Sequence, residues 1–181
     1  MTGSFFEELS IEIKKSVIER GHPFRFITMA TTGNESVARL RTVVLREVTE
    51  NLRLTIYTDS RTQKINHIHV NNQVSLLLYH PDKMMQLKVE GIAEIVTNTE
   101  RLKSTWQNIQ PNSRKDYITE TSPGTAIKNP DHVEYVEHKN HFTIIDIFPT
   151  KIEYLKLKRP NHIRALFSKT DDMWNGEFLV P

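Results

Sequence analysis

The pattern of apolar and polar positions changes early in the chain. In the first segment, apolar side chains recur at helical spacing, at Leu9, Ile13 and Val17. Ser4 and Glu7 have the spacing of a capping box, in which each side chain bonds a free backbone amide at the start of a helix. The pattern therefore predicts an N-terminal helix over residues 4–20.

Beyond this helix, the chain is typical of short strands rich in Val, Ile, Thr and aromatic residues. In the clearest one, apolar residues alternate with Lys88, Glu90 and Glu94. Ser60 or Thr62 can cap a short helix over residues 62–71, and a further helix opens at 97–100 with Leu102, Trp106 and Ile109 along one side. The stretch 110–140, which contains prolines, predicts a functional loop with short helices. The predicted strands are 24–31, 37–48, 52–57, 74–79, 84–96, 142–148, 152–158, 162–168 and 174–180.

Many short strands with few long helices favour a barrel or a sandwich over a fold of alternating strands and helices. A length of 181 residues suits one domain. The predicted fold is mainly β with flanking helices (α+β), in a single domain over residues 1–181. Its predicted parts are the helix 4–20, a barrel core at 24–96, a helical and loop insertion at 97–140, and C-terminal strands at 141–181.

Composition restricts the possible partners. The net charge of +2 is too small to indicate nucleic acid by itself, and the absence of cysteine excludes disulfides and thiolate metal sites. The first segment carries acidic residues throughout, unlike a signal peptide, and no segment approaches the roughly 20 apolar residues that cross a bilayer. We therefore expect a cytoplasmic protein with no membrane, nucleic-acid or metal partner.

Four cations gather around two predicted strands, at Arg41, Arg46, Arg61 and Lys64. Because the chain has only six glycines, this pattern indicates a phosphate site built from side chains rather than from a glycine-rich loop. Successive strand residues face opposite sides, so Arg41 and Arg46 emerge on different faces. One guanidinium can clamp a phosphate while the other lies nearer a ring or a substrate. Backbone amides at the start of the following helix, with Lys64, would complete an anion pocket.

Three motifs occur in a specific order: RTVVLR at 41–46, YTDSRTQK at 57–64 and QLKVEGIAE at 86–94. Their order, spacing and residue types resemble the flavin-binding core of the pyridoxamine 5′-phosphate oxidase-like family. The later segments SPG at 122–124, HIR at 162–164 and WNGEFLVP at 174–181 are similar to one branch of it, the oxidase-related flavin-binding proteins.

The resemblance implies a Greek-key, FMN-binding split β-barrel that forms a homodimer with FMN at the subunit interface. It implies that Arg41 and Lys64 bind the flavin phosphate and that Gln86 contacts the flavin from a partner-facing strand. Arg164 resembles an arginine late in the family's barrel. The expected cofactor-binding residues are Arg41, Thr42, Val43, Val44, Leu45, Arg46, Tyr57, Thr58, Arg61, Gln63, Lys64, Gln86, Ser122 and Arg164.

The chain also departs from the family pattern. The family's Ser-Arg-Lys run at the phosphate is Thr62-Gln63-Lys64 here, so the arginine moves to Arg61. The Tyr…Arg…Ser set that recognises the substrate phosphate in true oxidases does not register onto residues 99–124, and a tryptophan expected late in the chain is replaced around Leu155. These departures leave FMN binding expected and count against pyridoxamine 5′-phosphate oxidation.

The expected function is that of an FMN-dependent oxidoreductase acting on a small molecule, with no catalytic residue identified. Two alternatives stay open. The first is a non-catalytic flavin carrier or sensor. The second is a barrel that binds single-stranded nucleic acid, in which basic strands and aromatic side chains form a stacking platform.

Overall fold

The computed structural model describes residues 2–35 and 37–181. Its barrel strands are β1 (Phe26–Thr32), β2 (Ala38–Val48), β3 (Leu54–Asp59), β4 (Gln73–His80), β5 (Met85–Ile95) and β6 (Phe142–Lys156). They follow the order β3-β2-β1-β4-β5-β6, and β3 also pairs with β6, which closes an antiparallel barrel. Within it, β4-β1-β2-β3 is a Greek key. The predicted barrel architecture is confirmed.

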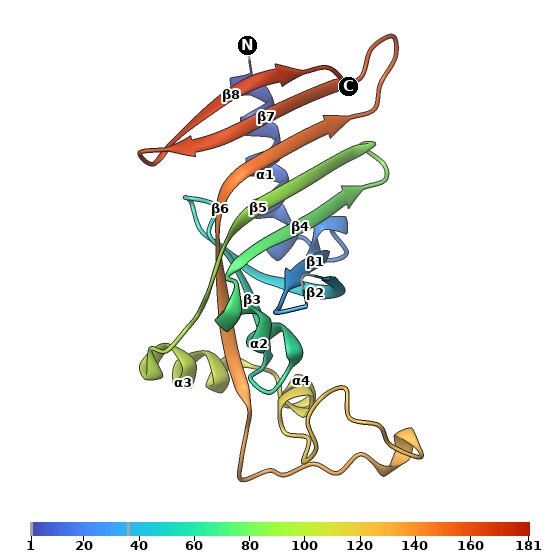
Figure 1. The fold of residues 1–181 in the computed structure, drawn as a ribbon, viewed down its shortest axis with the longest axis vertical. Coiled ribbons are helices and arrows are strands. Elements are labelled where there is room, and N and C mark those ends of the chain that lie inside the picture. Colours follow the sequence, from blue (N-terminus) through green and yellow to red (C-terminus); the bar gives the residue numbers. More distant parts are fainter. Residues whose placement is uncertain (1, 36) are drawn as a thin grey trace.

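Strand β6 is continuous over 15 residues, so the prediction of two separate strands at 142–148 and 152–158 is wrong. Pro149 interrupts the apolar pattern, but it lies opposite Gly91 where the register of β5 and β6 shifts. Such a bulge is one of the few places where a sheet accepts proline. Beyond it, β6 pairs with β7 (Ile163–Thr170), which pairs with β8 (Met173–Leu179). One strand therefore joins the barrel to the β7–β8 hairpin (Figure 1).

Helix α1 (Gly3–Ile18) lies behind the sheet in Figure 1 and bridges the barrel and the hairpin. Its Phe6 ring contacts Phe167 of β7, and its Phe5 ring contacts Tyr154 of β6. The helix begins at Gly3 with Thr2 as N-cap, and Thr2 makes no side-chain capping bond. Ser4 is therefore already inside the helix, and the predicted capping box is wrong.

The other helices lie in the connections. The predicted helices at 62–71 and after residue 97 are confirmed as α2 (Gln63–Val70) and α3 (Thr99–Asn108). Short helices also follow within 110–140, as expected, and a further turn delays the start of β1 to Phe26. These short elements are η1 (Pro23–Arg25), α4 (Pro111–Arg114), η2 (Lys115–Tyr117) and η3 (Pro130–His132). No helix in residues 2–35 and 37–181 is long and apolar enough to cross a membrane.

Two apolar clusters hold these layers together. The larger fills the barrel and includes Val43, Leu45 and Ile56. The smaller lies outside the barrel, where Trp106 of α3 packs with Tyr117 and Phe142. Because this outer cluster fixes α3 and η2 against β3 and β6, a space remains between these helices and the outer side of β2.

Candidate functional site

Strand β2 brings Arg41 to one end of the barrel. Val43 and Leu45 are buried in the barrel core, so alternation places Arg41 on the same inward side. Its guanidinium donates hydrogen bonds to the hydroxyl of Thr31 (2.7 Å) and the carbonyl of Met29 (3.2 Å) on the neighbouring strand. These neutral acceptors orient the guanidinium and leave its charge uncompensated.

Lys64, at the start of α2, meets Arg41 in the same region. Its ammonium donates to the hydroxyls of Thr58 (2.8 Å) and Thr62 (3.2 Å). Burial, together with the positive charge of Arg41, lowers the pKa of Lys64 to about 8. Burial also lowers the pKa of Arg41. Two cations held close together by neutral partners favour the binding of an anion.

Arg41 and Lys64 line one pocket of about 710 Å³. Thr62 and Gln63 add the first turn of α2, whose free backbone amides point out of the helix start. Pro123 and Gly124 form another wall, and the preceding Ser122 does not itself line the pocket. We call this the phosphate pocket, because its charges and donors match a phosphate dianion.

Arg61 has other partners. Its guanidinium donates to both carboxylate oxygens of Asp59 (3.0 and 2.7 Å) and to the backbone carbonyls of Thr119 and Glu120 (both 2.9 Å). Its side chain thus connects the β3–α2 turn to the loop that carries Ser122. A direct contact of Arg61 with a phosphate stays a prediction, and the observed geometry assigns Arg61 to the loop.

A β-bulge places Arg46 and Glu47 on the same side of β2. The pairing of β2 with β3 shifts register between Leu45 and Glu47, so Arg46 and Glu47 line the same outer pocket although they are consecutive. The guanidinium carbon of Arg46 lies 5.6 Å from the centroid of the Tyr57 ring. This second pocket has a volume of about 400 Å³ and lies between β2–β3 and the segment from α3 to η2. We call it the Tyr57 pocket.

The remaining predicted residues lie on the outer face of the sheet. Thr42 and Val44 alternate with the buried residues of β2 and pair with Thr28 and Phe26 of β1. On β5 and β7, Gln86 pairs with Leu155 of β6, which in turn pairs with Arg164. Gln86 and Arg164 therefore lie in one row across three strands, and neither lines the phosphate pocket.

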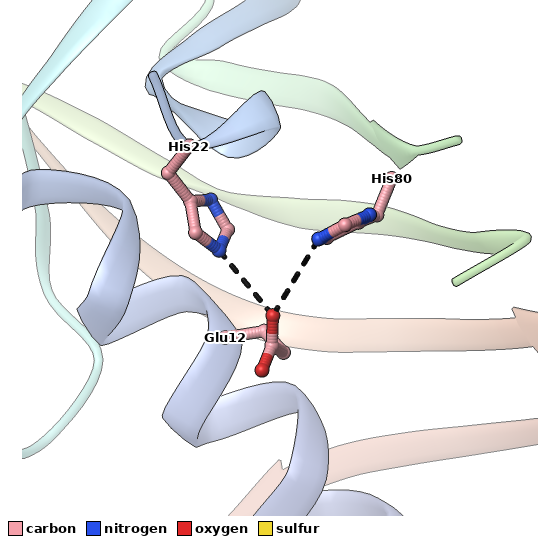
Figure 2. Close-up of side chains that lie close together, drawn as sticks. All are labelled: Glu12, His22 and His80. Atoms are coloured by element: carbon pink, nitrogen blue, oxygen red, sulfur yellow. Dashed lines mark hydrogen bonds and ion pairs between the residues drawn. The ribbon is translucent and has the colours of Figure 1, made fainter. Parts of the chain in front are cut away.

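Three buried residues form another cluster, shown in Figure 2: Glu12 of α1, His22, and His80 at the end of β4. Their exposed fractions are 3%, 6% and 7%. One oxygen of Glu12 lies 3.3 Å from Nε2 of His22 and 3.8 Å from Nε2 of His80. The ammonium of Lys83 lies 2.5 Å from the other oxygen.

The hydrogen bonds on the far side of each ring determine what this cluster can do. Nδ1 of His22 accepts the backbone N–H of Phe24 (3.1 Å), and Nδ1 of His80 accepts that of Lys83 (3.4 Å). In each neutral ring the proton therefore lies on Nε2, which points at Glu12. A metal would need the Nε2 lone pair, with Nδ1 as the donor. The three side chains of Glu12, His22 and His80 thus connect α1 to the barrel, and we call this group the clasp.

Sequence reasoning missed Thr31, the residue that positions Arg41. Thr31 accepts from Arg41 and also shares a hydrogen bond with Nδ1 of His67 on α2 (3.0 Å). The sequence does hold one signal of this role: Ile27, Met29 and Thr31 are the inward positions of β1, and the third is polar. The clasp at Glu12 has no such signal, because its members are far apart in the chain.

Comparisons with known proteins agree with this geometry. Residues 4–97, more than half of the chain, match the family described as pyridoxamine 5′-phosphate oxidase, FMN-binding domain. The chain is 24% identical over 162 residues to a pyridoxine/pyridoxamine 5′-phosphate oxidase of Shewanella pealeana, covering 83% of this chain and 76% of that protein. It is 25% identical over 168 residues to one of Vibrio cholerae, covering 86% and 79%.

Solved structures share the fold over nearly the whole chain. A pyridoxamine 5′-phosphate oxidase-related, FMN binding protein of Nostoc punctiforme has a TM-score of 0.79 at 20% identity, covering 97% of this chain and 96% of that one. PhzG of Burkholderia lata, solved with tetrahydrophenazine-1-carboxylic acid, has a TM-score of 0.78 at 14% identity, covering 97% and 92%. The chain therefore belongs to the pyridoxamine 5′-phosphate oxidase family of FMN-binding domains.

Proposed function

We propose that this protein is an FMN-dependent oxidoreductase that acts on a small organic molecule. The observation that carries the proposal is the convergence of Arg41 and Lys64, from a strand and a helix, on one pocket of about 710 Å³. The lining of that pocket fits the terminal phosphate of FMN. Burial and the positive charge of Arg41 lower the pKa of Lys64, and a bound dianion opposes both effects, so the phosphate stabilises both ammonium and guanidinium.

The strand pair β2–β3 connects this pocket to the Tyr57 pocket. Arg41 and Arg46 are five residues apart on an extended strand, a separation of about 17 Å. Thr58 turns toward Lys64 while the preceding residue, Tyr57, lines the outer pocket. We assign residues 42–46 and Tyr57 to the remainder of the cofactor, as the family resemblance implies. We assign the Tyr57 pocket to the substrate, so Arg46 and Tyr57, which also line this pocket, border both ligands.

FMN, when bound, supplies the electron transfer, and the chain supplies binding, orientation and electrostatics. Arg41 and Lys64 hold the phosphate end. Arg46, whose Nε is buried, places a positive charge beside the Tyr57 pocket, which favours negative charge on a neighbouring ring or substrate. The loop at 119–124, held by Arg61, closes one side of the phosphate pocket.

We also propose that the protein is a homodimer. Large apolar residues are exposed on the outer faces of neighbouring strands, at Phe26 of β1, Leu40 of β2, and Leu77 and Tyr79 of β4. Leu40 also lines the phosphate pocket, so this face and the pocket adjoin. Gln86 pairs with Tyr79 and extends the same face. A second copy docked here would cover the apolar side chains and bring its Gln86 toward the cofactor.

Purification and a visible spectrum test the proposal. We expect a yellow protein that releases one FMN per chain and sediments as a dimer. Leu77→Glu should yield monomers that retain less FMN, whereas Glu94→Lys, a charge change at another exposed site, should leave both unchanged. A colourless protein that does not take up added FMN would contradict the proposal.

Turnover separates an enzyme from a flavin carrier. We expect oxidation of some small organic donors but little aldehyde production from pyridoxine 5′-phosphate, because the Tyr…Arg…Ser set is missing. A protein that binds FMN stoichiometrically but oxidises no donor in a broad panel would instead be a carrier or sensor. Rapid turnover of pyridoxine 5′-phosphate would show that the missing set is dispensable.

A further inference from the structure

The Tyr57 pocket carries a different charge from the phosphate pocket. Among the described residues that line it, Arg46 is the one cation, and its Nε is buried without a hydrogen-bond partner in the protein. Because Nε itself is shielded, a ligand in this pocket would bond the terminal nitrogens of the Arg46 guanidinium. Most of the other lining side chains are neutral hydroxyls and amides, such as Ser113 and Asn108.

Two neighbouring charged groups, Glu47 and Arg114, do not change the number of cations that a ligand in this pocket can contact. Glu47 lines the pocket, but its carboxylate accepts a hydrogen bond from the Tyr57 hydroxyl (2.8 Å) and lies 3.6 Å from the guanidinium of Arg101. Arg114 is nearby, but it donates to the backbone carbonyls of Ile109 (3.0 Å) and Gln107 (2.9 Å). Arg114 does not line the pocket and its donors are used by these carbonyls, so Arg46 is the one cation of the described lining that a ligand can contact directly.

The phosphate pocket, which we assign to a dianion, contains two cations, Arg41 and Lys64. The two cations lie close together, and burial with the charge of Arg41 lowers the pKa of Lys64 to about 8. A phosphate monoester carries close to two negative charges at neutral pH, and one guanidinium compensates only half of them. A carboxylate carries one charge and matches one guanidinium in a bidentate pair.

We propose that the Tyr57 pocket selects small organic carboxylates, bound through Arg46, and discriminates against phosphate monoesters. The inference rests on the proposed function and names its substrate class. The carboxylate bonds the terminal nitrogens of Arg46, and a planar body lies against Tyr57 and Ile109. Hydroxyl and amide groups at Ser113 and Asn108 are placed for further polar substituents.

Three probes that share a phenyl ring test the charge preference: benzoate, phenyl phosphate and benzyl alcohol. Each is titrated into the FMN-loaded protein by calorimetry and by the change in flavin absorbance. We expect benzoate to bind about tenfold more tightly than benzyl alcohol, the effect of one charge-assisted hydrogen bond, and more tightly than phenyl phosphate. Tighter binding of phenyl phosphate, or equal binding of all three, would overturn the inference.

Two variants locate the effect. Arg46→Gln should reduce benzoate binding to that of benzyl alcohol, and Ile109→Lys, which adds a second cation to the same lining, should shift the preference toward phenyl phosphate. Benzoate binding that is unchanged in Arg46→Gln would also overturn the inference.

FMN content is measured first, so failure of the cofactor proposal is recognised separately. Because the charge count depends on the chain alone, the calorimetric titration is repeated on flavin-free protein. A colourless protein that still prefers benzoate would contradict FMN binding and support the pocket. A yellow protein that does not prefer benzoate would support FMN binding and contradict the proposed selectivity of the pocket.

Discussion

Lys64 donates a 2.8 Å hydrogen bond to the hydroxyl of Thr58, so its ammonium is held by a neutral group and not by a carboxylate. Arg41 is held in the same way by Thr31. Both cations are therefore oriented before a ligand arrives, and neither has to break an ion pair to bind it. Preorganisation of this kind reduces the cost of binding an anion.

Removing the Lys64 ammonium should weaken FMN binding. We expect Lys64→Ala to lose about 1.5–3 kcal/mol, or roughly 10- to 150-fold in Kd, because one charge-assisted contact is lost. Quenching of FMN fluorescence measures the Kd. Lys103→Ala, which removes an exposed lysine of α3, is the matched control and should leave the Kd unchanged. Equal FMN affinity in the two variants would contradict the assignment of the pocket.

FMN affinity should also fall above pH 8. Burial and the charge of Arg41 lower the pKa of Lys64 to about 8, so the free protein loses this positive charge as the pH rises through that value. A phosphate binds the charged form, so Kd should increase above pH 8 and stay nearly constant between roughly pH 6.5 and 8. Lys64→Arg, which stays charged, should remove the alkaline decline. The same decline in this variant would assign the titration to another group.

The ion pair of Arg61 with Asp59 should control the loop rather than the phosphate directly. Arg61→Ala removes the bonds to Thr119 and Glu120, so amide exchange at 119–124 should accelerate and FMN should bind several-fold more weakly. Asp59→Asn keeps the Arg61 charge but loosens its position, and it should have the same two effects. If Asp59→Asn bound FMN as well as the unmodified protein while Arg61→Ala did not, direct contact with the phosphate would be the better account.

The clasp of Glu12, His22 and His80 should make the protein sensitive to acid. Burial, His22 and Lys83 lower the pKa of His80, so the folded state binds fewer protons than the unfolded state. Stability is therefore maintained above the ordinary histidine pKa of about 6.5 and falls as the pH drops below it. Burial acts to raise the pKa of Glu12, but Lys83 and His22 outweigh it, so loss of this carboxylate adds to the decline near pH 4.

Urea unfolding between pH 7.5 and 4.5 measures this dependence, and His80→Gln, which retains a donor toward Glu12, should flatten the part between pH 6.5 and 5. Added Zn²⁺ should not raise the Tm, because both Nε2 atoms carry protons. A Tm that rises with Zn²⁺ would show that the rings can adopt the other tautomer.

Gly91 should tolerate no side chain. A Cβ atom at this position would lie 2.5 Å from the carbonyl oxygen of Phe148 across the β5–β6 bulge. We expect Gly91→Ala to destabilise the fold by about 1–3 kcal/mol in urea unfolding, because the backbone has to move. Gly3→Ala is the control: nothing lies within 4 Å of its added Cβ, so stability should be equal or higher. Equal midpoints for both variants would show that the bulge can relax.

The sequence was sufficient to predict those parts of the fold that follow from local periodicity. The alternation of β5 and the helical spacing of α1 and α3 each lie within one segment, and all were found close to their observed bounds. The two strands predicted on either side of Pro149 were wrong because a bulge, formed with a distant strand, accepts the proline. Propensity describes a residue's local preference and not the register of its partner strand.

The same limit applies to the candidate site. Alternation separated Arg41 from Arg46 correctly, but it could not show that a bulge brings Glu47 to the side of Arg46. The acidic partner of Arg61 was two residues away in the sequence, yet its backbone partners Thr119 and Glu120 depended on how the loop folds. Local patterns identified the charged residues, but the groups that each residue contacts depend on the tertiary fold.

The uninterrupted strand β6 has a consequence for how the molecule loses its structure. Its first half is bonded to β3 and its second half to β7, so the barrel and the hairpin share one continuous strand. Denaturation should therefore be a single cooperative event in which amides of β3 and β7 exchange with the same free energy. A hairpin that melts alone would have to lose the β6–β7 ladder at residues 151–156 while the rest of the sheet stays paired.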